Sequence, residues 1–67
     1  MNKFSERFRD VLRDKNISQV DLAYKIGMSQ SVLSNYCTGK REPTLDVLFS
    51  ICKALGVSAD YLLGLED

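Results

Sequence analysis

Residues 18–40 read SQVDLAYKIGMSQSVLSNYCTGK, and this stretch decides the fold. Its apolar residues recur at the three- and four-residue spacing of a helix face, in two segments that Gly27 separates. Only Gly27 and Met28 join the two segments. Because so short a connection does not let the second helix fold back as a hairpin, the two helices are expected to cross steeply.

Several positions of this corner have fixed requirements, and the sequence meets all of them. Ala23 has to be small because the second helix passes close to its Cβ atom. Gly27 has to accept a positive φ in the turn. The residues expected to be apolar, so that they bury the corner, are Leu22, Ile26, Met28, Leu33 and Tyr36. The joint match predicts a helix-turn-helix unit over about residues 18–38.

Helical spacing continues through the rest of the chain, and no stretch alternates with a period of two. The pattern predicts three further helices, one before this unit and two after it. The expected caps are Asn2, Ser18, Ser29, Thr44 and Ser58, and the expected stops are Asn16, Gly27, Gly39, Gly56 and Gly64. The inner faces of the first and fourth helices are expected to be Phe4, Phe8, Val11 and Leu12, and Leu45, Leu48, Ile51, Cys52 and Leu55. The predicted fold class is therefore all-α, a five-helix bundle with residues 1–67 as a single domain.

Composition limits the classes of function. No apolar run approaches the roughly 20 residues of a membrane-spanning helix, and the charged start MNKFSERFRD has no signal-peptide core. A cytoplasmic location is therefore expected. Two cysteines and no histidine are too few for a structural zinc site. Cys37 and Cys52 could form one bridge, but cytosolic thiols stay reduced, so both are expected to be buried as small hydrophobic residues.

The formal net charge is zero, but the charges are unevenly distributed. Residues 1–41 hold eight Lys and Arg against four Asp and Glu, a net charge of +4. Residues 42–67 hold one Lys against five Asp and Glu, a net charge of −4. The positive half contains the helix-turn-helix unit, which favours an anionic partner there. Chance scatter of solvated charges explains the same pattern equally well.

Residues 18–40, followed by REPTLDVLFSICKALGVSADYLLG at residues 41–64, resemble the phage-repressor and Cro type of helix-turn-helix domain, the XRE family. The resemblance extends from about Phe4 to Gly64. It implies a lambda-repressor-like bundle whose third helix enters the major groove of double-stranded DNA. It also implies a transcriptional regulator, most simply a repressor, that binds a palindromic operator as a dimer.

The outward face of the third helix agrees with this implication. Its residues are short or planar polar groups around one valine, whereas an ordinary solvated face is richer in Lys and Glu. Gln and Asn can pair with adenine, Ser can donate or accept, and Val can meet a thymine methyl group. The residues expected to contact bases are Gln30, Ser31 and Asn35, with Ser34 and Val32 as secondary candidates. The alternative is a polar surface with no partner.

Contacts to the DNA backbone are expected at both ends of the helix-turn-helix unit. Gln19 and Ser29 stand where helices begin, and free N–H groups there can hold phosphates. By the resemblance, Thr38, Lys40 and Arg41 lie in a loop along the DNA backbone. Tyr36 is expected in the core, and Arg7, Arg9 and Arg13 are expected on the solvated surface.

One departure from the family pattern gives a separate hypothesis. Many members carry an Arg on the first helix and a Glu near the end of the third, and the two pair internally. This chain has Leu12 and Cys37 at those positions. Because replacing a partly buried ion pair by apolar contact is often neutral or stabilising, Leu12 is expected to pack on Cys37.

A homodimer is expected because one copy should bind DNA weakly: it has few cations to neutralise phosphates, and its base contacts add little free energy. The candidate dimer surface comprises Leu65, Tyr61 and Val57, while Leu62 and Leu63 are expected to complete the core.

Catalysis is not expected, since the chain has no histidine, no Gly-rich phosphate loop and no base to activate Cys37. No cofactor, metal or small-molecule ligand is evident. The alternative function is a protein-interaction or antitoxin-like module built on the same bundle.

Overall fold

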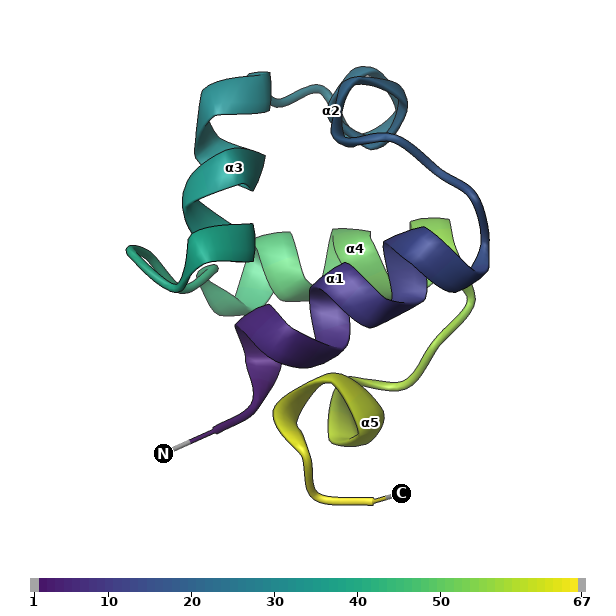
Figure 1. Cartoon of the computed structure of the whole chain (residues 1–67), viewed down its shortest axis with the longest axis vertical. Coiled ribbons are helices and arrows are strands. Elements are labelled where there is room, and N and C mark those ends of the chain that lie inside the picture. Colours follow the sequence, from purple (N-terminus) through teal and green to yellow (C-terminus); the bar gives the residue numbers. More distant parts are fainter. Residues whose placement is uncertain (1, 67) are drawn as a thin grey trace.

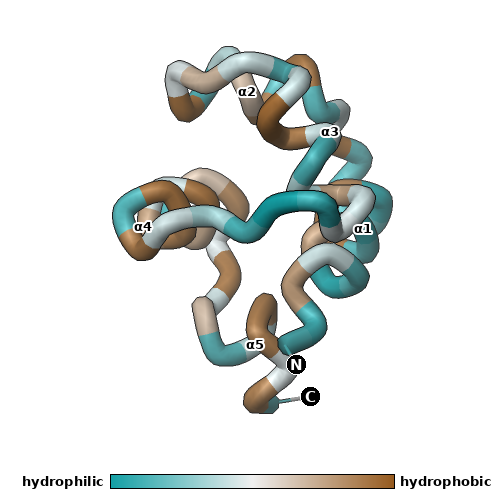
Figure 2. Tube along the Cα trace, turned by 90° about the vertical axis from the view of Figure 1, so that its left-hand side faces the viewer, coloured by the Kyte–Doolittle hydropathy of each residue, from teal (hydrophilic) through white to brown (hydrophobic). Residues whose placement is uncertain are grey.

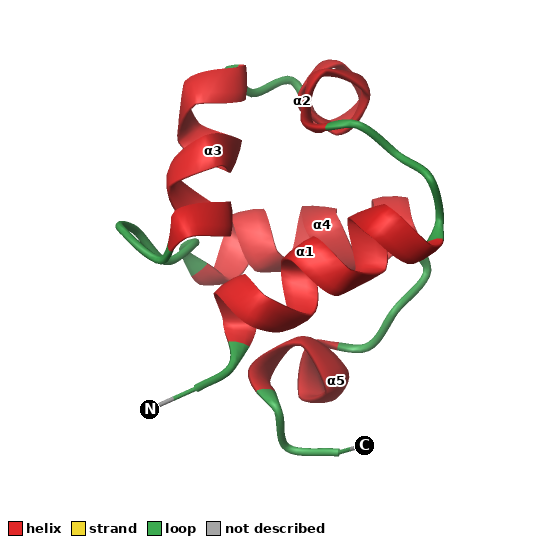
Figure 3. Ribbon diagram, viewed as in Figure 1, coloured by secondary structure: helices red, strands yellow, loops and turns green. Residues whose placement is uncertain are grey.

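The computed structural model describes residues 2–66 and contains five helices in that range (Figure 1). They are α1 (Phe4–Asp14), α2 (Gln19–Ile26), α3 (Gln30–Thr38), α4 (Leu45–Leu55) and α5 (Ala59–Leu63). Figure 3 shows helices joined by loops and no strand in this part of the chain. The prediction of an all-α bundle is confirmed.

Local hydrogen bonds explain where four of the helices begin. The side-chain oxygens of Ser18, Ser29, Thr44 and Ser58 each accept the main-chain N–H three residues later, at 3.0–3.4 Å. Each of these caps has an extended backbone, as an N-cap requires. The same four helices end at glycines, as the sequence predicts.

The start of α1 differs slightly from the expectation. Lys3 occupies the capping position and its side chain makes no capping hydrogen bond. The Asn2 side chain accepts the N–H of Phe4 at 2.9 Å, so it satisfies a first-turn donor from one position further back. At the other end, Asn16 takes the expected left-handed conformation with φ 57°.

The helices pack around one core. In Figures 1 and 2, α2 and α3 form one end of the molecule, α5 lies at the other, and α1 and α4 lie between them. Phe4 and Phe8 stack with ring centroids 5.2 Å apart, and Tyr36 meets Phe4 edge-on at 6.1 Å. The largest fully buried side chains come from all five helices: Phe4, Phe8, Leu22, Leu33, Ile51 and Leu62. The expected core position of Tyr36 is confirmed.

The predicted burial of Leu45 is wrong. It was expected on the inner face of α4, but its side chain is 83% exposed. The buried stripe of α4 consists of Leu48, Ile51 and Leu55, and Leu45 lies one turn before it, directly after the cap. Cys52 also departs from its expected burial, being half-buried, whereas Cys37 is buried; both thiols are free.

The longest helices in residues 2–66 have 11 residues. None of the helices described there is long and apolar enough to cross a membrane.

Candidate nucleic-acid interface

The corner between α2 and α3 has the geometry that its sequence requires. Gly27 ends α2 with φ 71°, and Met28 N–H donates to the Ala23 carbonyl at 2.9 Å. Ala23 is buried in the core. A Cβ atom built on Gly27 meets nothing within 4 Å, so the requirement for glycine there is conformational and not steric.

One side of α3 carries four polar residues and faces away from the core. Gln30, Ser31, Ser34 and Asn35 line a single surface depression, and we call these four residues the polar face. Their spacing of one, four and five residues places them on one side of a helix. The opposite side of α3 is buried through Leu33, Tyr36 and Cys37. In Figure 1, α3 stands at the outer edge of the molecule.

Val32 lies apart from this group. Its side chain is half-buried and packs against the core, at the border between the two sides of α3. The structure thus brings four of the five candidate base-contacting residues together and leaves Val32 at the margin.

The loop after α3 is fixed to the end of that helix. The main-chain nitrogens of Lys40 and Arg41 lie 3.0 and 3.3 Å from the Asn35 carbonyl oxygen. Thr38, expected in this loop, is instead the last residue of α3, and its hydroxyl donates to the same carbonyl at 3.2 Å. Thr38, Lys40 and Arg41 are all exposed. In Figure 2 the α3–α4 connection crosses the side facing the viewer as a strongly hydrophilic segment.

The two residues expected at helix starts differ in exposure. Ser29 is exposed and caps α3. Gln19 is half-buried, and its side-chain amide donates to the Cys37 sulfur at 3.4 Å. Sequence reasoning did not foresee this hydrogen bond, because 18 residues separate its two partners.

Two of the three arginines expected on the solvated surface also have specific partners; Arg9 is exposed, as expected, and Arg7 is half-buried. The Arg9 guanidinium donates to the Cys37 carbonyl, near the C-terminal end of α3. The positive charge there is favourable for the helix dipole. Arg7 donates to the carbonyls of Tyr61 and Glu66, and its guanidinium lies 4.6 Å from the centroid of the Tyr61 ring. No periodicity in the sequence distinguishes these two arginines from solvated ones.

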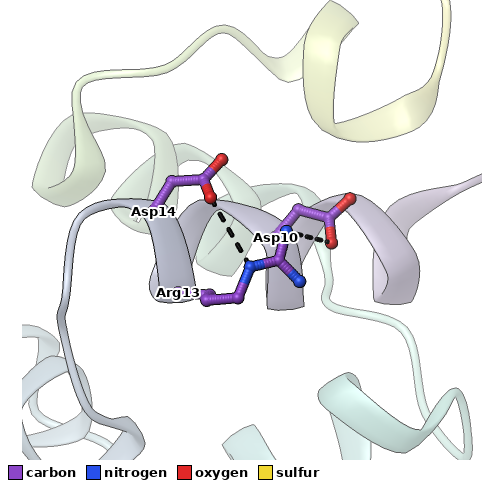
Figure 4. A network of polar contacts seen from close by, with 3 residues as sticks. All are labelled: Asp10, Arg13 and Asp14. Carbon is purple, nitrogen blue, oxygen red and sulfur yellow. Dashed lines mark ion pairs between the residues drawn. The ribbon is translucent and has the colours of Figure 1, made fainter.

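Arg13 behaves as expected. It pairs with Asp10 at 3.2 Å and with Asp14 at 3.5 Å on the exposed side of α1 (Figure 4). Its side chain is 71% exposed, so these ion pairs add little to stability.

Leu12 and Cys37 are both buried in the same core cluster, as the packing hypothesis requires. Burial raises the pKa of the Cys37 thiol, and the nearby Arg9 and the hydrogen bond from Gln19 only partly offset this. Burial likewise raises the pKa of Cys52. Both thiols are therefore protonated at neutral pH and are poor nucleophiles. Within residues 2–66 no three His, Cys, Asp or Glu side chains gather where they could hold a metal ion.

The candidate dimer residues have mixed exposure. Leu65 is 74% exposed, whereas Val57 and Tyr61 are half-buried and line a second depression. Leu62 is fully buried and Leu63 is half-buried, as expected for residues that complete the core. Among residues 2–66, the other large apolar side chains with high exposure are Val20, Tyr24, Leu45 and Phe49.

Comparison with known proteins gives a consistent family. The family model described as Helix-turn-helix matches residues 8–62. The HTH-type transcriptional regulator YqaE of Bacillus subtilis is 37% identical over 60 residues, which are 90% of this chain and 52% of that protein. YobD, another such regulator of Bacillus subtilis, is 33% identical over 96% of this chain and 57% of its own length. The immunity repressor of Bacillus phage phi105 is 28% identical over 91% of this chain and 42% of its own length. The chain thus spans about half the length of the curated relatives it matches.

Proposed function

Because the chain belongs to the helix-turn-helix family of transcriptional regulators, we propose that it binds specific sequences of double-stranded DNA with α3 in the major groove. The observation that carries this proposal is the polar face. Four polar side chains lie together on the outer side of a helix whose other side is fixed in the core. Gln30 and Ser31 are exposed, and Ser34 and Asn35 are half-buried. Amides and hydroxyls of this length can reach base edges from a helix that fits the groove.

Contacts to the DNA backbone would hold α3 in position. The exposed Ser29, at the start of α3, lies beside the free N–H groups of its first turn, which favour an anion. Thr38 at the end of α3, and Lys40 and Arg41 in the loop after it, would contact phosphates, because all three are hydrogen-bonded to the Asn35 carbonyl. Gln19 would contact a phosphate at the start of α2. Such contacts fix orientation without reading sequence.

We propose further that two copies bind one palindromic operator. The longest dimension of one copy, measured over its Cα atoms, is 28 Å. Recognition helices on neighbouring half-sites are about 34 Å apart, so one copy does not reach from one half-site to the next. The formal net charge of zero also limits what one copy gains by releasing counterions. If each copy neutralises roughly three phosphates, a dimer neutralises roughly six, and log affinity falls with a slope near −5 against log salt. Leu65, Tyr61 and Val57 are the proposed dimer surface.

The proposed biological role is repression of transcription at the nucleoid, in the cytoplasm. Residues 1–67 would act as a single DNA-binding domain. Binding to the operator needs no cofactor, metal or small-molecule ligand in this proposal, and no reaction is catalysed. A repressor of this kind acts by occupying DNA that other proteins require.

The test is selection from a randomised duplex pool at two salt concentrations, followed by fluorescence anisotropy on the selected duplexes. We expect a palindrome with half-sites about one helical turn apart. Gln30→Ala and Asn35→Ala should reduce the preference for this palindrome over random duplex. Ser50→Ala on α4, whose hydroxyl donates to the Asp46 carbonyl, is the matched control and should bind as the unmodified chain does.

Equal and weak binding to every duplex, with no enrichment, contradicts this function. The remaining candidate would then be a protein-interaction or antitoxin-like module, and a pull-down from lysate would be the next measurement.

A further inference from the structure

A second surface, between α2 and α4, is separate from the polar face. These two helices pack against each other, with α4 below α2 in Figure 2. Side chains from both line one surface depression, which we call the α2–α4 depression: Lys25, Ile26, Phe49, Ser50, Lys53 and Ala54. None of the six belongs to the polar face, to the candidate phosphate contacts or to the proposed dimer surface.

The α2–α4 depression exposes apolar surface. Phe49 is 65% exposed. Ile26 and Ala54 beside it are half-buried and pack against the core. Leu45, four residues before Phe49 and 83% exposed, extends the apolar surface along the same side of α4. A contiguous apolar surface of this kind, bordered by polar groups, is typical of an interaction site.

The charges in the α2–α4 depression have one sign. Lys25 and Lys53 are both exposed, and Lys53 Nζ lies 5.5 Å from the centroid of the Phe49 ring. The acidic residues of α2 and α4, Asp21 and Asp46, do not line the depression. Across residues 2–66 no ion pair involves either lysine. Two cations without carboxylate partners therefore flank an exposed aromatic ring.

A second copy of this chain and DNA both fit this surface poorly. Contact about a two-fold axis puts the same surface on both copies, so Lys25 and Lys53 of one copy would face those of the other. Like charges across an interface cost free energy. DNA phosphates would match the lysines but would leave Phe49 without an apolar contact. The matching partner carries carboxylates beside large apolar side chains.

We propose that the α2–α4 depression docks an acidic amphipathic helix of another protein. The apolar side of that helix covers Phe49, and its Asp or Glu side chains pair with Lys25 and Lys53. An apolar centre with a charged rim is the usual composition of such an interface, and a helix in a groove is a common mode of peptide recognition. The proposal does not depend on the proposed DNA-binding function, because the depression shares no residue with the polar face.

Selection from a displayed library of random peptides, with the whole chain as bait, tests the docking site. We expect enrichment of peptides that combine Asp or Glu with Leu, Phe or Trp. The tightest selected peptide is then labelled, and its affinity is measured by fluorescence anisotropy. Phe49→Ala should weaken its binding by about 5- to 30-fold, the effect of losing one hot-spot side chain. Val20→Ala is the matched control, because Val20 is also exposed but does not line the depression.

A second variant tests the two charges. Lys25→Gln combined with Lys53→Gln should weaken binding of the selected peptide and remove most of its salt dependence, since salt screens exposed charges. Circular dichroism should show that this variant and Phe49→Ala stay folded, because all three side chains are exposed.

Several results overturn the docking site. Enrichment of basic or uncharged peptides contradicts its charge, and the absence of any enriched peptide removes it. Equal affinity of the selected peptide for Phe49→Ala and the unmodified chain means that the peptide docks elsewhere. A lower sedimentation mass of Phe49→Ala without peptide means that a second copy covers the depression. If the Phe49 and lysine variants instead weaken binding to every DNA duplex, this surface contacts DNA.

Discussion

The side-chain amide of Gln19 donates a hydrogen bond to the Cys37 sulfur, 3.4 Å away. Gln19 is the first residue of α2, and Cys37 lies on the buried side of α3, one residue before its end. The bond therefore links the start of one helix of the unit to the last turn of the other. The Cys37 carbonyl also accepts from Arg9 of α1, so three helices meet at this cysteine.

Gln19→Ala and Lys40→Ala form a matched pair of tests for backbone contact. Each variant should weaken binding to all duplexes by one factor, whatever their sequence, since phosphates carry no sequence information. For Gln19→Ala we expect about two- to fivefold, the effect of one lost hydrogen bond per copy. Only Lys40→Ala should also flatten the salt dependence, by a slope of about 1 per copy. A change of preferred sequence in either variant would place that residue among the base readers instead.

Cys37→Glu tests the packing of Leu12 on Cys37. With Leu12 unchanged, the nearby Arg9, which already donates to the Cys37 carbonyl, offsets the burial of the new carboxylate only in part, and we expect a loss of stability of about 2–4 kcal/mol. Leu12→Arg together with Cys37→Glu should be less destabilising than the two single changes added together. The measurement is urea unfolding followed by circular dichroism. If Cys37→Glu alone leaves stability unchanged, the packing hypothesis is wrong.

Gly27→Ala tests the conformational requirement at the corner. We expect a loss of about 1–2 kcal/mol, because alanine is strained at φ 71° although there is room for its Cβ atom. Gly27→Asn should cost less, since Asn takes the left-handed conformation more readily. Thermal unfolding of the two variants measures the difference. Equal losses for Ala and Asn would indicate a steric cause that the structure does not contain.

Leu45→Ala and Leu48→Ala compare an exposed leucine and a buried leucine one turn apart on α4. Leu48 is buried, so its truncation should cost about 2–4 kcal/mol. Leu45 is 83% exposed, and its truncation should change stability by less than about 0.5 kcal/mol. Urea unfolding of both variants at neutral pH is the measurement. A large loss for Leu45→Ala would mean that a partner covers this residue in solution.

Stability should fall at alkaline pH through the two cysteines. Burial raises the pKa of both thiols above their ordinary value of 9.0 in the folded state, so the folded protein holds these protons more tightly. Their contribution is fully present below pH 9 and is lost as the pH rises through the folded pKa values. The Cys37→Ala, Cys52→Ala double variant should lose less stability between pH 8 and pH 10 than the unmodified chain. The difference between the two slopes isolates the contribution of the two thiols, and identical slopes would contradict the raised pKa values.

Features that depend on neighbouring residues could be predicted from the sequence alone. The caps at Ser18, Ser29, Thr44 and Ser58 each need only an N–H three residues away, and the turn at Gly27 needs only a residue that accepts positive φ. The buried side of α3 follows from helical spacing, and the polar face follows as its complement. The sequence therefore determined the five helices, the ends of α2 to α5, and the grouping of Gln30, Ser31, Ser34 and Asn35.

Features that depend on contacts between helices were decided only by the tertiary structure. Leu45 fits the period of its helix, but no other helix covers its position, so it stays exposed. Arg7, Arg9 and Gln19 resemble ordinary surface residues until α5 and α3 bring carbonyls and a sulfur within their reach. Spacing along one helix specifies the direction of a side chain, whereas its partner depends on where the chain returns tens of residues away.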